Sequence, residues 1–380
     1  MNYEQLPSNT QIIPRDIVER NGYMNGFAAG HINEGVTKII IEDGTTAIGW
    51  GAFSDCTQIT SVTIPSSVTA IEEDAFSNCT SLAEINIPDT VTYFGADPFY
   101  GTPWRESHTE EFFVAGDGVL LKYQGSESYV MIPKNVKKIG RNAFKGNTRI
   151  SYAAILDSVT EIDVGAFCDC MFLKDISIPK SVKIIRVTTN EGAFDYTPWY
   201  DNYKDDFMIV GDGILLKYRG NDKTVTVPDN VKRINTAAFK GCSAVEEINF
   251  PDSIEYVEDF SLYDTAWYKN YEGDFLTAGK VLVKYKGKDT AVTVPNGVVT
   301  IGEGAFGGSA VESVTLPDSL TCIGNFAFCE SGELEKISIP ESVKNIGDMA
   351  FAFCKRLSEV KLGDTDVKMG RAVFRNTAIQ

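Results

Sequence analysis

Histidine and cysteine are the side chains best suited to nucleophilic, acid–base or zinc chemistry, and this chain has two histidines and eight cysteines. A Ser-His-Asp or Cys-His mechanism would need His31 or His108 beside a nucleophile, and neither histidine falls in a recognisable motif. No Cys-x-x-Cys pair or histidine-bearing ligand cluster is present, so a zinc site is not expected. The sequence indicates no catalytic centre, and we expect no enzymatic activity, no metal and no cofactor.

Three further patterns could hold a ligand, but each has a simpler structural explanation. The Gly-Asp-Gly triplets at 116–118 and 211–213 lack the regular row of oxygen ligands that a calcium loop needs. A glycosidase needs two carboxylates that face each other across a cleft, and nothing singles out one pair among the many acids. No glycine-rich phosphate loop is present. We interpret these patterns as hairpin turns and solvated surface.

The charge balance restricts the class of partner. Asp and Glu total 52 against 35 Lys and Arg, which gives a net charge of −17 that repels nucleic acid and anionic lipid. No segment is apolar over the ~18 residues that a membrane helix needs, and residues 1–10 lack the features of an export signal. Two alternatives remain open: the protein works inside the cell, or its export signal has been removed.

A phenylalanine, usually preceded by alanine, returns at nearly constant intervals and organises the whole chain. The intervals are 23, 23, 45, 23, 27, 45, 21, 46, 22, 23 and 23 residues, so three gaps are about twice the basic step. Such a step is the mark of a solenoid rather than of a globular enzyme fold. The pattern comprises Phe53, Phe76, Phe99, Phe144, Phe167, Phe194, Phe239, Phe260, Phe306, Phe328, Phe351 and Phe374.

The repeat unit predicts two walls with the phenylalanine between them. An apolar-x-x-apolar-x-apolar segment, such as Leu82, Ile85 and Ile87 before Pro88, predicts a short strand that proline ends. One such strand per turn must stack into a parallel ladder; twelve in an unbroken ladder would span roughly 50 Å. A Val-x-x-Ile-Gly segment then forms the opposite wall. We expect an α/β or mainly β repeat solenoid over residues 36–380, after an irregular N-terminal segment, 1–35, that covers the first turn and contains a short helix after Pro14.

A small residue stands three positions after most of the repeat phenylalanines. A position that accepts Cys, Asn, Ser or Thr indicates an inward side chain that bonds backbone groups at a bend, so we interpret these cysteines as structural thiols. Neighbouring turns bring Cys56 and Cys79 close, which leaves a disulfide between them open. The cysteines at this position are Cys56, Cys79, Cys170, Cys242 and Cys354.

The three double intervals contain inserts that resemble one another, near residues 102–129, 197–224 and 265–291. Each has two apolar segments around a tight Gly-containing turn, which predicts a β-hairpin grafted onto the solenoid. A tryptophan recurs near the start of each insert, and it either packs the root of the hairpin or forms an exposed binding aromatic. The three are Trp104, Trp199 and Trp267.

The repeat resembles the BspA-type leucine-rich repeat, whose pattern Leu-x-x-Val-x-Ile-Pro-x-x-Val-x-x-Ile-Gly-x-x-Ala-Phe-x-x-Cys matches Leu82 to Ile87 and the residues around them, and extends from Val36 to Thr377. The hairpins and the irregular stretch 187–190 depart from it. The resemblance implies a curved, right-handed superhelix, on or outside bacterial cells or in some parasitic protists, that takes part in adhesion or host-protein binding. The count of ladder strands gives this superhelix about twelve turns. Fold alone does not fix function.

Two sets of residues are candidates for partner binding. The outward positions of the ladder are mostly small and polar, with few of the anchors that make hot spots, whereas aromatic residues gather around the inserts. The candidates on the ladder are Glu84, Asn86, Tyr152, Asp175, Glu247 and Asn249. The candidates in the inserts are Trp199, Tyr200, Tyr203, Trp267, Tyr268 and Tyr271.

Two function hypotheses follow. The first is a monomeric, non-catalytic protein of the bacterial surface or exterior that binds an unidentified protein or glycan. The second is a structural spacer within a larger protein. Binding that is lost when Trp199 or Tyr200 is changed would favour the first hypothesis, and an export signal upstream of this chain would settle the compartment.

Overall fold

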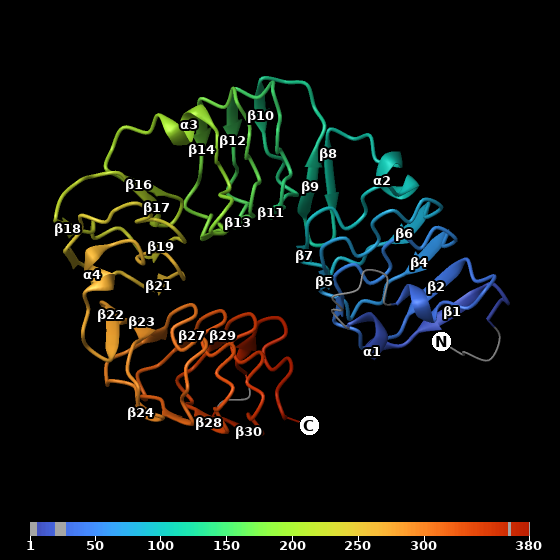
Figure 1. The fold of residues 1–380 in the computed structure, drawn as a ribbon. Helices are drawn as coiled ribbons and strands as arrows, with labels where there is room; N and C mark the ends of the chain where they lie inside the picture. Colours follow the sequence, from blue (N-terminus) through green and yellow to red (C-terminus); the bar gives the residue numbers. More distant parts are fainter. Residues whose placement is uncertain (1–5, 20–27, 364–365, 380) are drawn as a thin grey trace. The chain divides into compact units, whose positions relative to one another are not determined.

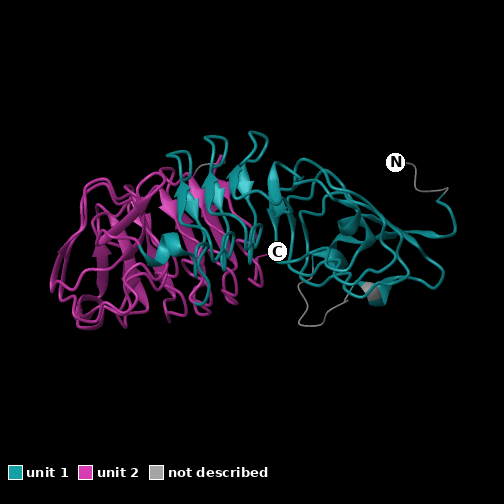
Figure 2. Cartoon of the chain, turned by 90° about the horizontal axis from the view of Figure 1, so that it is seen from above, with its two compact units in different colours: residues 1–186, 190–202 teal, residues 187–189, 203–380 magenta. Residues whose placement is uncertain are grey.

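The structure is a computed structural model that describes residues 6–19, 28–363 and 366–379 of the 380-residue chain. The chain forms two compact units, residues 1–186 with 190–202 and residues 187–189 with 203–380 (Figure 2). Each unit is a parallel β-solenoid of short strands and turns (Figure 1). In the described residues the α-helices are only four or five residues long, so the fold is mainly β rather than α/β.

The predicted ladder strands are present in unit 1, where they form two separate parallel sheets. Neighbouring strands pair in register, residue for residue; Ser61, for example, is opposite Glu84. The first sheet contains β1 (Thr10–Ile13), β2 (Lys38–Ile41), β4 (Ser61–Thr63) and β6 (Glu84–Asn86). The second contains β10 (Tyr129–Met131), β12 (Tyr152–Ala154) and β14 (Asp175–Ser177).

Unit 2 also has two ladder sheets. One pairs β18 (Thr224–Thr226) with β20 (Glu247–Asn249), and the other contains β24 (Ala291–Thr293), β26 (Ser313–Thr315), β28 (Lys336–Ile339) and β30 (Glu359–Leu362). The length of roughly 50 Å required an unbroken ladder, and that condition is not met, because the ladder breaks at each insert.

The N-terminal segment contributes a strand that the repeat pattern does not predict. Strand β1 pairs with β2, so Thr10–Ile13 extends the ladder by one position. The short helix expected after Pro14 is present as α1 (Arg15–Val18), and a 3₁₀ turn, η2, follows at Ala29–His31. Ile13 and Val18 are fully buried, which ties this segment to the core of unit 1.

The second wall consists of two-residue strands, also parallel. Glycine follows many of them because the next turn passes very close: a Cβ on Gly95 would lie 2.1 Å from the backbone nitrogen of Glu73. In unit 1 these strands are β3 (Ala47–Ile48), β5 (Ala70–Ile71), β7 (Tyr93–Phe94), β11 (Lys138–Ile139), β13 (Glu161–Ile162) and β15 (Ile184–Ile185). In unit 2 they are β19 (Arg233–Ile234), β21 (Tyr256–Val257), β25 (Thr300–Ile301), β27 (Cys322–Ile323), β29 (Asn345–Ile346) and β31 (Lys368–Met369).

The three inserts form the predicted antiparallel hairpins, and their turns contain glycines with φ between 56° and 76°. The second strand of each hairpin also pairs in parallel with the second wall; Val119, for example, is opposite Lys138. The hairpins are thus integral to their turns and not only attached to them. They are β8 (Phe112–Ala115) with β9 (Val119–Tyr123), β16 (Phe207–Val210) with β17 (Ile214–Tyr218), and β22 (Phe275–Ala278) with β23 (Val281–Tyr285).

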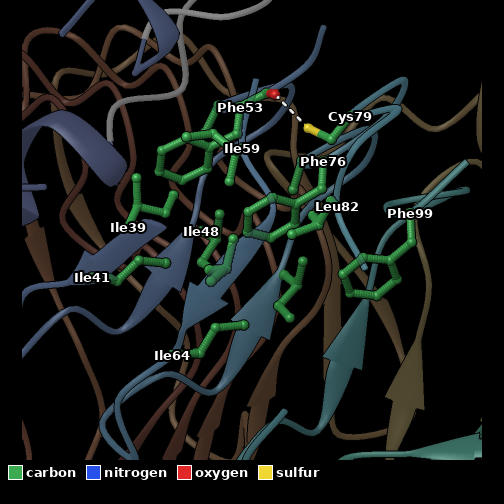
Figure 3. Packing of buried hydrophobic residues seen from close by; sticks show 14 of the residues in the cluster. Ile39, Ile41, Ile48, Phe53, Ile59, Ile64, Phe76, Cys79, Leu82 and Phe99 are labelled. Atoms are coloured by element: carbon green, nitrogen blue, oxygen red, sulfur yellow. Dashed lines mark hydrogen bonds between the residues drawn. The ribbon is translucent and has the colours of Figure 1, made fainter. Parts of the chain in front are cut away.

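The repeat phenylalanines stack between the two walls (Figure 3). Phe53 and Phe76 have ring centroids 5.2 Å apart at an interplanar angle of 5°, and Phe76 and Phe99 follow at 5.8 Å and 7°. The same stacking recurs in unit 2, where Phe306 and Phe328 are 4.8 Å apart. The prediction of an inward aromatic row is confirmed for these residues.

A tyrosine fills the phenylalanine position inside each double interval. Tyr123 stacks on Phe144 at 5.0 Å, and its backbone nitrogen donates to Ala143 O at 2.8 Å, as Phe144 does to the next turn. Tyr285 stacks on Phe306 in the same way at 5.2 Å, and Tyr218 packs on Phe239 at 5.3 Å with its ring tilted by 33°. All three are buried. The interval of about 45 residues is therefore two ordinary turns, and these tyrosines belong to the core.

Phe260 is the exception to the aromatic row, and its assignment from sequence is wrong. Phe260 is 48% exposed and has φ of 57°, whereas Leu262 is fully buried. In other turns the backbone nitrogen of the core phenylalanine donates to the residue just before the next core side chain, as Phe53 N does to Ala75 O. Phe239 N donates to Ser261 O, which is the residue just before Leu262. Register therefore places Leu262, not Phe260, in the row.

The cysteines after the phenylalanines are free thiols, as are the other described cysteines. Cys79 Sγ donates to Phe53 O at 3.0 Å (Figure 3), and Cys170 and Cys354 make the same bond to the preceding turn, at 3.1 and 3.0 Å. Ser331 Oγ makes the equivalent bond and donates to Phe306 O at 2.8 Å. The predicted role as a backbone-bonding inward residue is confirmed for these residues, and Cys56 and Cys79 form no disulfide.

Candidate functional site

A short helix begins each insert, and its sequence explains why. Threonine caps the helix in all three: Thr102, Thr197 and Thr265 accept a hydrogen bond from the backbone nitrogen three residues later. Proline follows the cap in the first two, where its missing N–H costs nothing. The helices are α2 (Pro103–Ser107), α3 (Pro198–Asp201) and α4 (Ala266–Lys269).

These helices end the ladder sheets. The backbone nitrogen of the tryptophan donates to the turn before it, from Trp104 to Leu82 O, from Trp199 to Leu173 O and from Trp267 to Val245 O, each at 2.9 Å. The helix thus lies where the next ladder strand would pair, which explains the breaks in the ladder. The three inserts place their tryptophans in equivalent positions beside β6, β14 and β20.

The indole rings pack on the roots of the inserts. Trp104 is 8% exposed and meets Phe99 edge-on at 4.7 Å, and Trp199 meets Phe194 at 4.9 Å. Trp267 meets Phe250 at 5.3 Å. The packing alternative therefore holds for all three rings. Trp199 and Trp267 are half-buried and keep some surface open to solvent.

The tyrosines of the third insert are held mainly by their own neighbours. Tyr268 stacks on Tyr263 at 4.4 Å, and the Lys286 ammonium lies 4.3 Å from the Tyr268 ring centre. Burial raises the pKa of both tyrosines. Tyr271 is 36% exposed, and its hydroxyl donates to Phe275 O at 2.6 Å. This cluster packs its own insert more than it offers a free binding surface.

The remaining insert candidates fall in different units. Tyr200 belongs to α3 in unit 1, whereas Tyr203 belongs to unit 2, and both are half-buried. Burial raises the pKa of Tyr203.

The polar ladder candidates are exposed, as expected, but they are scattered over three sheets. Glu247 accepts a hydrogen bond from Thr224 at 3.2 Å, and Asp175 accepts one from the backbone of Ile176 at 2.9 Å. Glu84 and Asn86 lie on β6 and Asn249 on β20. These exposed side chains are polar, and within each sheet they offer groups that can donate or accept hydrogen bonds.

One part of the ladder face differs from the rest, and the sequence reasoning found only a piece of it. Tyr129 and Tyr152 are opposite each other on β10 and β12, and their rings stack at 4.8 Å and 12°. Tyr129 is 57% exposed and Met131 54% exposed, and Met131 is opposite Ala154. We call Tyr129, Met131, Tyr152 and Ala154 the tyrosine patch. The rule that alternate residues of a ladder strand face outward, applied to Tyr129–Met131, would have predicted the whole patch.

The histidines have structural surroundings. His108 lies against Trp104 and Phe113, with ring centroids 4.6 and 4.2 Å away, and its Nδ1 is 2.8 Å from Trp104 O. His31 ends η2. Over residues 6–19, 28–363 and 366–379, no group of three histidine, cysteine or acidic side chains could hold a metal ion. A helix of the length and apolarity needed for a membrane span is also absent from those ranges.

A two-walled parallel solenoid with one strand per turn, an inward aromatic row and a backbone-bonding thiol defines a leucine-rich-repeat type of protein. The family model for the BspA type leucine rich repeat region matches in six copies over residues 31–111, 122–197, 216–272 and 283–380. The chain belongs to this family. Repeats of this family suggest protein interaction and are typically not enzymatic.

Several solved structures are similar to the chain. A leucine-rich repeat protein from Bacteroides ovatus is 21% identical, with 90% of this chain and 76% of that chain covered and a TM-score of 0.25. A leucine rich cell surface protein from Faecalibacterium prausnitzii is 23% identical, with coverage of 87% and 80% and a TM-score of 0.22. The pneumococcal vaccine antigen PcpA is 17% identical, with coverage of 91% and 71% and a TM-score of 0.21. No curated protein matches at a significant level.

Proposed function

We propose that the chain is a non-catalytic protein of the bacterial surface that binds another protein through the tyrosine patch of unit 1, in an adhesion-type interaction. Membership of the BspA-type family supports the surface location, because proteins of this family are typically found there. The observation that carries the proposal is the exposed Tyr129–Tyr152 stack with Met131 beside it.

The composition of the patch supports protein recognition. Tyrosine and methionine are enriched at interfaces, and tyrosine is common among the few residues that dominate binding energy. The stack also fixes both rings before a partner arrives, which lowers the entropy lost on binding. At the equivalent strand positions in unit 2, Thr224 faces Glu247, which offers neither property.

The test is a binding assay of the whole chain against purified matrix proteins and a glycan panel. We expect saturable binding to a protein, and we expect the double variant Tyr129→Ser, Tyr152→Ser to weaken it at least about tenfold, as loss of hot-spot residues does. The matched control is Thr224→Ala, Glu247→Ala at the equivalent positions, which leaves binding unchanged. Thermal unfolding checks that every variant is folded.

Three results would contradict the proposal. Binding to glycans alone would replace the protein partner by a carbohydrate. Equal binding by the patch variant and the control variant would remove the patch from recognition. A failure to bind anything would leave the spacer hypothesis as the better account, and the deep packing of the insert aromatics is compatible with that role.

A further inference from the structure

A small pocket at the root of the first hairpin is lined by three cationic side chains. Its volume is about 40 Å³, and Arg105 of α2, Lys122 of β9 and Arg141 after β11 reach its wall, with Asp97 as the one acid. Phe94 and Phe113 contribute an apolar side. A net positive lining is unusual in a chain whose net charge is −17.

The cations of this pocket are incompletely paired. Asp97 pairs with Arg105 at 3.1 Å. The Arg141 guanidinium lies 4.0 Å from Glu191, whose carboxylate is nearer to Lys145, at 2.5 Å. The Nε of Arg141 is buried without a hydrogen-bond partner in the described part of the chain. A buried donor without an acceptor is costly, so it indicates a place for an added acceptor.

Lys122 differs from its counterparts in the other hairpins. Lys217 donates to Lys240 O and Lys284 to Gly304 O, each at 2.7 Å, and burial lowers the pKa of both. Lys122 is exposed and makes no such bond or ion pair among the residues that the structure covers. Its ammonium is therefore available to a ligand of the pocket.

The cationic set is specific to the first hairpin. The positions of Arg105 and Arg141 hold Tyr200 and Thr236 in the second hairpin. In the third hairpin they hold Tyr268 and Glu303. The repeat architecture needs neither arginine, since two of the three inserts fold without them. The arginines are thus additions to one copy.

We propose that this pocket binds a carboxylate or an oxyanion of similar size. Arginine donates two hydrogen bonds in a fixed fork that matches such groups, and the apolar side strengthens their attraction by lowering the local dielectric constant. The volume corresponds to about three water molecules, which a carboxylate or sulfate would displace. The oxyanion is either a free anion or the carboxylate of a peptide, and the two share the same recognition chemistry.

The experiment titrates the whole chain with acetate and with sulfate and measures binding by isothermal titration calorimetry. Acetamide, which has the size of acetate but no charge, is the control ligand. We expect saturable binding of at least one anion and none of acetamide. Arg141→Gln and Lys122→Gln each weaken anion binding about tenfold, the usual loss for a charged hydrogen bond. Lys134→Gln, an exposed lysine outside the pocket, leaves it unchanged.

A fourth variant gives an effect of opposite sign. Asp97→Asn removes the internal carboxylate that competes for Arg105, and asparagine tolerates the positive φ of 42° at this position. It therefore tightens anion binding severalfold. A peptide with a free C-terminal carboxylate, compared with its amidated form, distinguishes the sources: preference for the free acid without acetate or sulfate binding assigns the site to a peptide carboxylate.

Three results would overturn the proposal. The first is an equal response to acetate and acetamide together with no preference for the free-acid peptide. The second is an unchanged anion affinity in both Arg141→Gln and Lys122→Gln. The third is weaker anion binding by Asp97→Asn. Because unfolded variants would also lose binding, each variant is first shown to melt as the parent chain does.

Discussion

Replacing Leu262 and Phe260 by alanine, one at a time, tests which side chain fills the core of their turn. Leu262 is fully buried, whereas Phe260 is 48% exposed. The repeat pattern predicts the opposite order of importance, because Phe260 resembles the repeat phenylalanine and Leu262 does not. The two variants therefore separate register from residue type as the determinant of packing.

The two substitutions differ in their expected cost to the free energy of unfolding. Leu262→Ala removes a fully buried side chain and leaves a cavity, which costs about 2–5 kcal/mol of the free energy of unfolding. Phe260→Ala loses a contact with Tyr263, whose ring centroid is 4.8 Å away. Such a pair contributes about 0.5–1.5 kcal/mol and this one is partly solvated, so the cost is below about 1 kcal/mol.

Urea unfolding followed by circular dichroism measures both costs against the parent chain. Both substitutions lie in unit 2, so they perturb the same transition. A shift of the midpoint without a change of slope reports a change in stability rather than in the denatured state. Equal shifts, or a larger shift for Phe260→Ala, would refute the assignment of Leu262 to the core row.

Three further predictions follow from the buried groups. Phe76→Ala should lower the free energy of unfolding by ~3–5 kcal/mol, since the ring is fully buried, and an unchanged melting curve would contradict an inward row. Burial alone would raise the pKa of Glu161, but the charges of Arg186 and Lys138 lower it below the ordinary value of 4.5. The stability that this carboxylate contributes is present above pH 4.5 and is lost as the pH falls through the lowered pKa; Glu161→Gln should flatten that part of the stability curve and cost ~3 kcal/mol at pH 7. Burial raises the pKa of Cys170 and Cys354 to about 12, so iodoacetamide should modify them only after unfolding, as mass spectrometry of their peptides would report.

The sequence predicted the parts of the fold that repeat. Alternating Val, Ile and Leu before proline located the ladder strands, and the spacing of the phenylalanines located the core row. The pattern did not predict the core role of Tyr123 and its two counterparts, because it was defined by phenylalanine alone. A hydroxyl at that position is tolerated when it reaches an acceptor, as the Tyr123 hydroxyl does at Glu111, 3.2 Å away. Spacing, rather than residue identity, was the stronger signal.

The ladder breaks were also within reach of sequence reasoning. Thr102-Pro103 and Thr197-Pro198 have the cap and first-turn residues of a helix, and a helix cannot continue a parallel ladder. The pocket beside α2 was not predictable in this way. Arg105, Lys122 and Arg141 are separated by 17 and 19 residues, and the pairing of β9 with β11 brings the last two near each other. Their closeness to Arg105 is evident only from the folded chain.

The breaks in the ladder give a physical reason for the position of the tyrosine patch. Each break leaves a first strand, β10, β18 or β24, whose outward side chains have a ladder neighbour on one side only. An outward side chain there keeps more surface than one inside a sheet. Large apolar residues occupy those positions only in β10, as Tyr129 and Met131, whereas β18 has threonines and β24 has Ala291 and Thr293. Since exposed apolar area at an edge risks unwanted association, its presence at one of three equivalent places favours the proposed use in recognition.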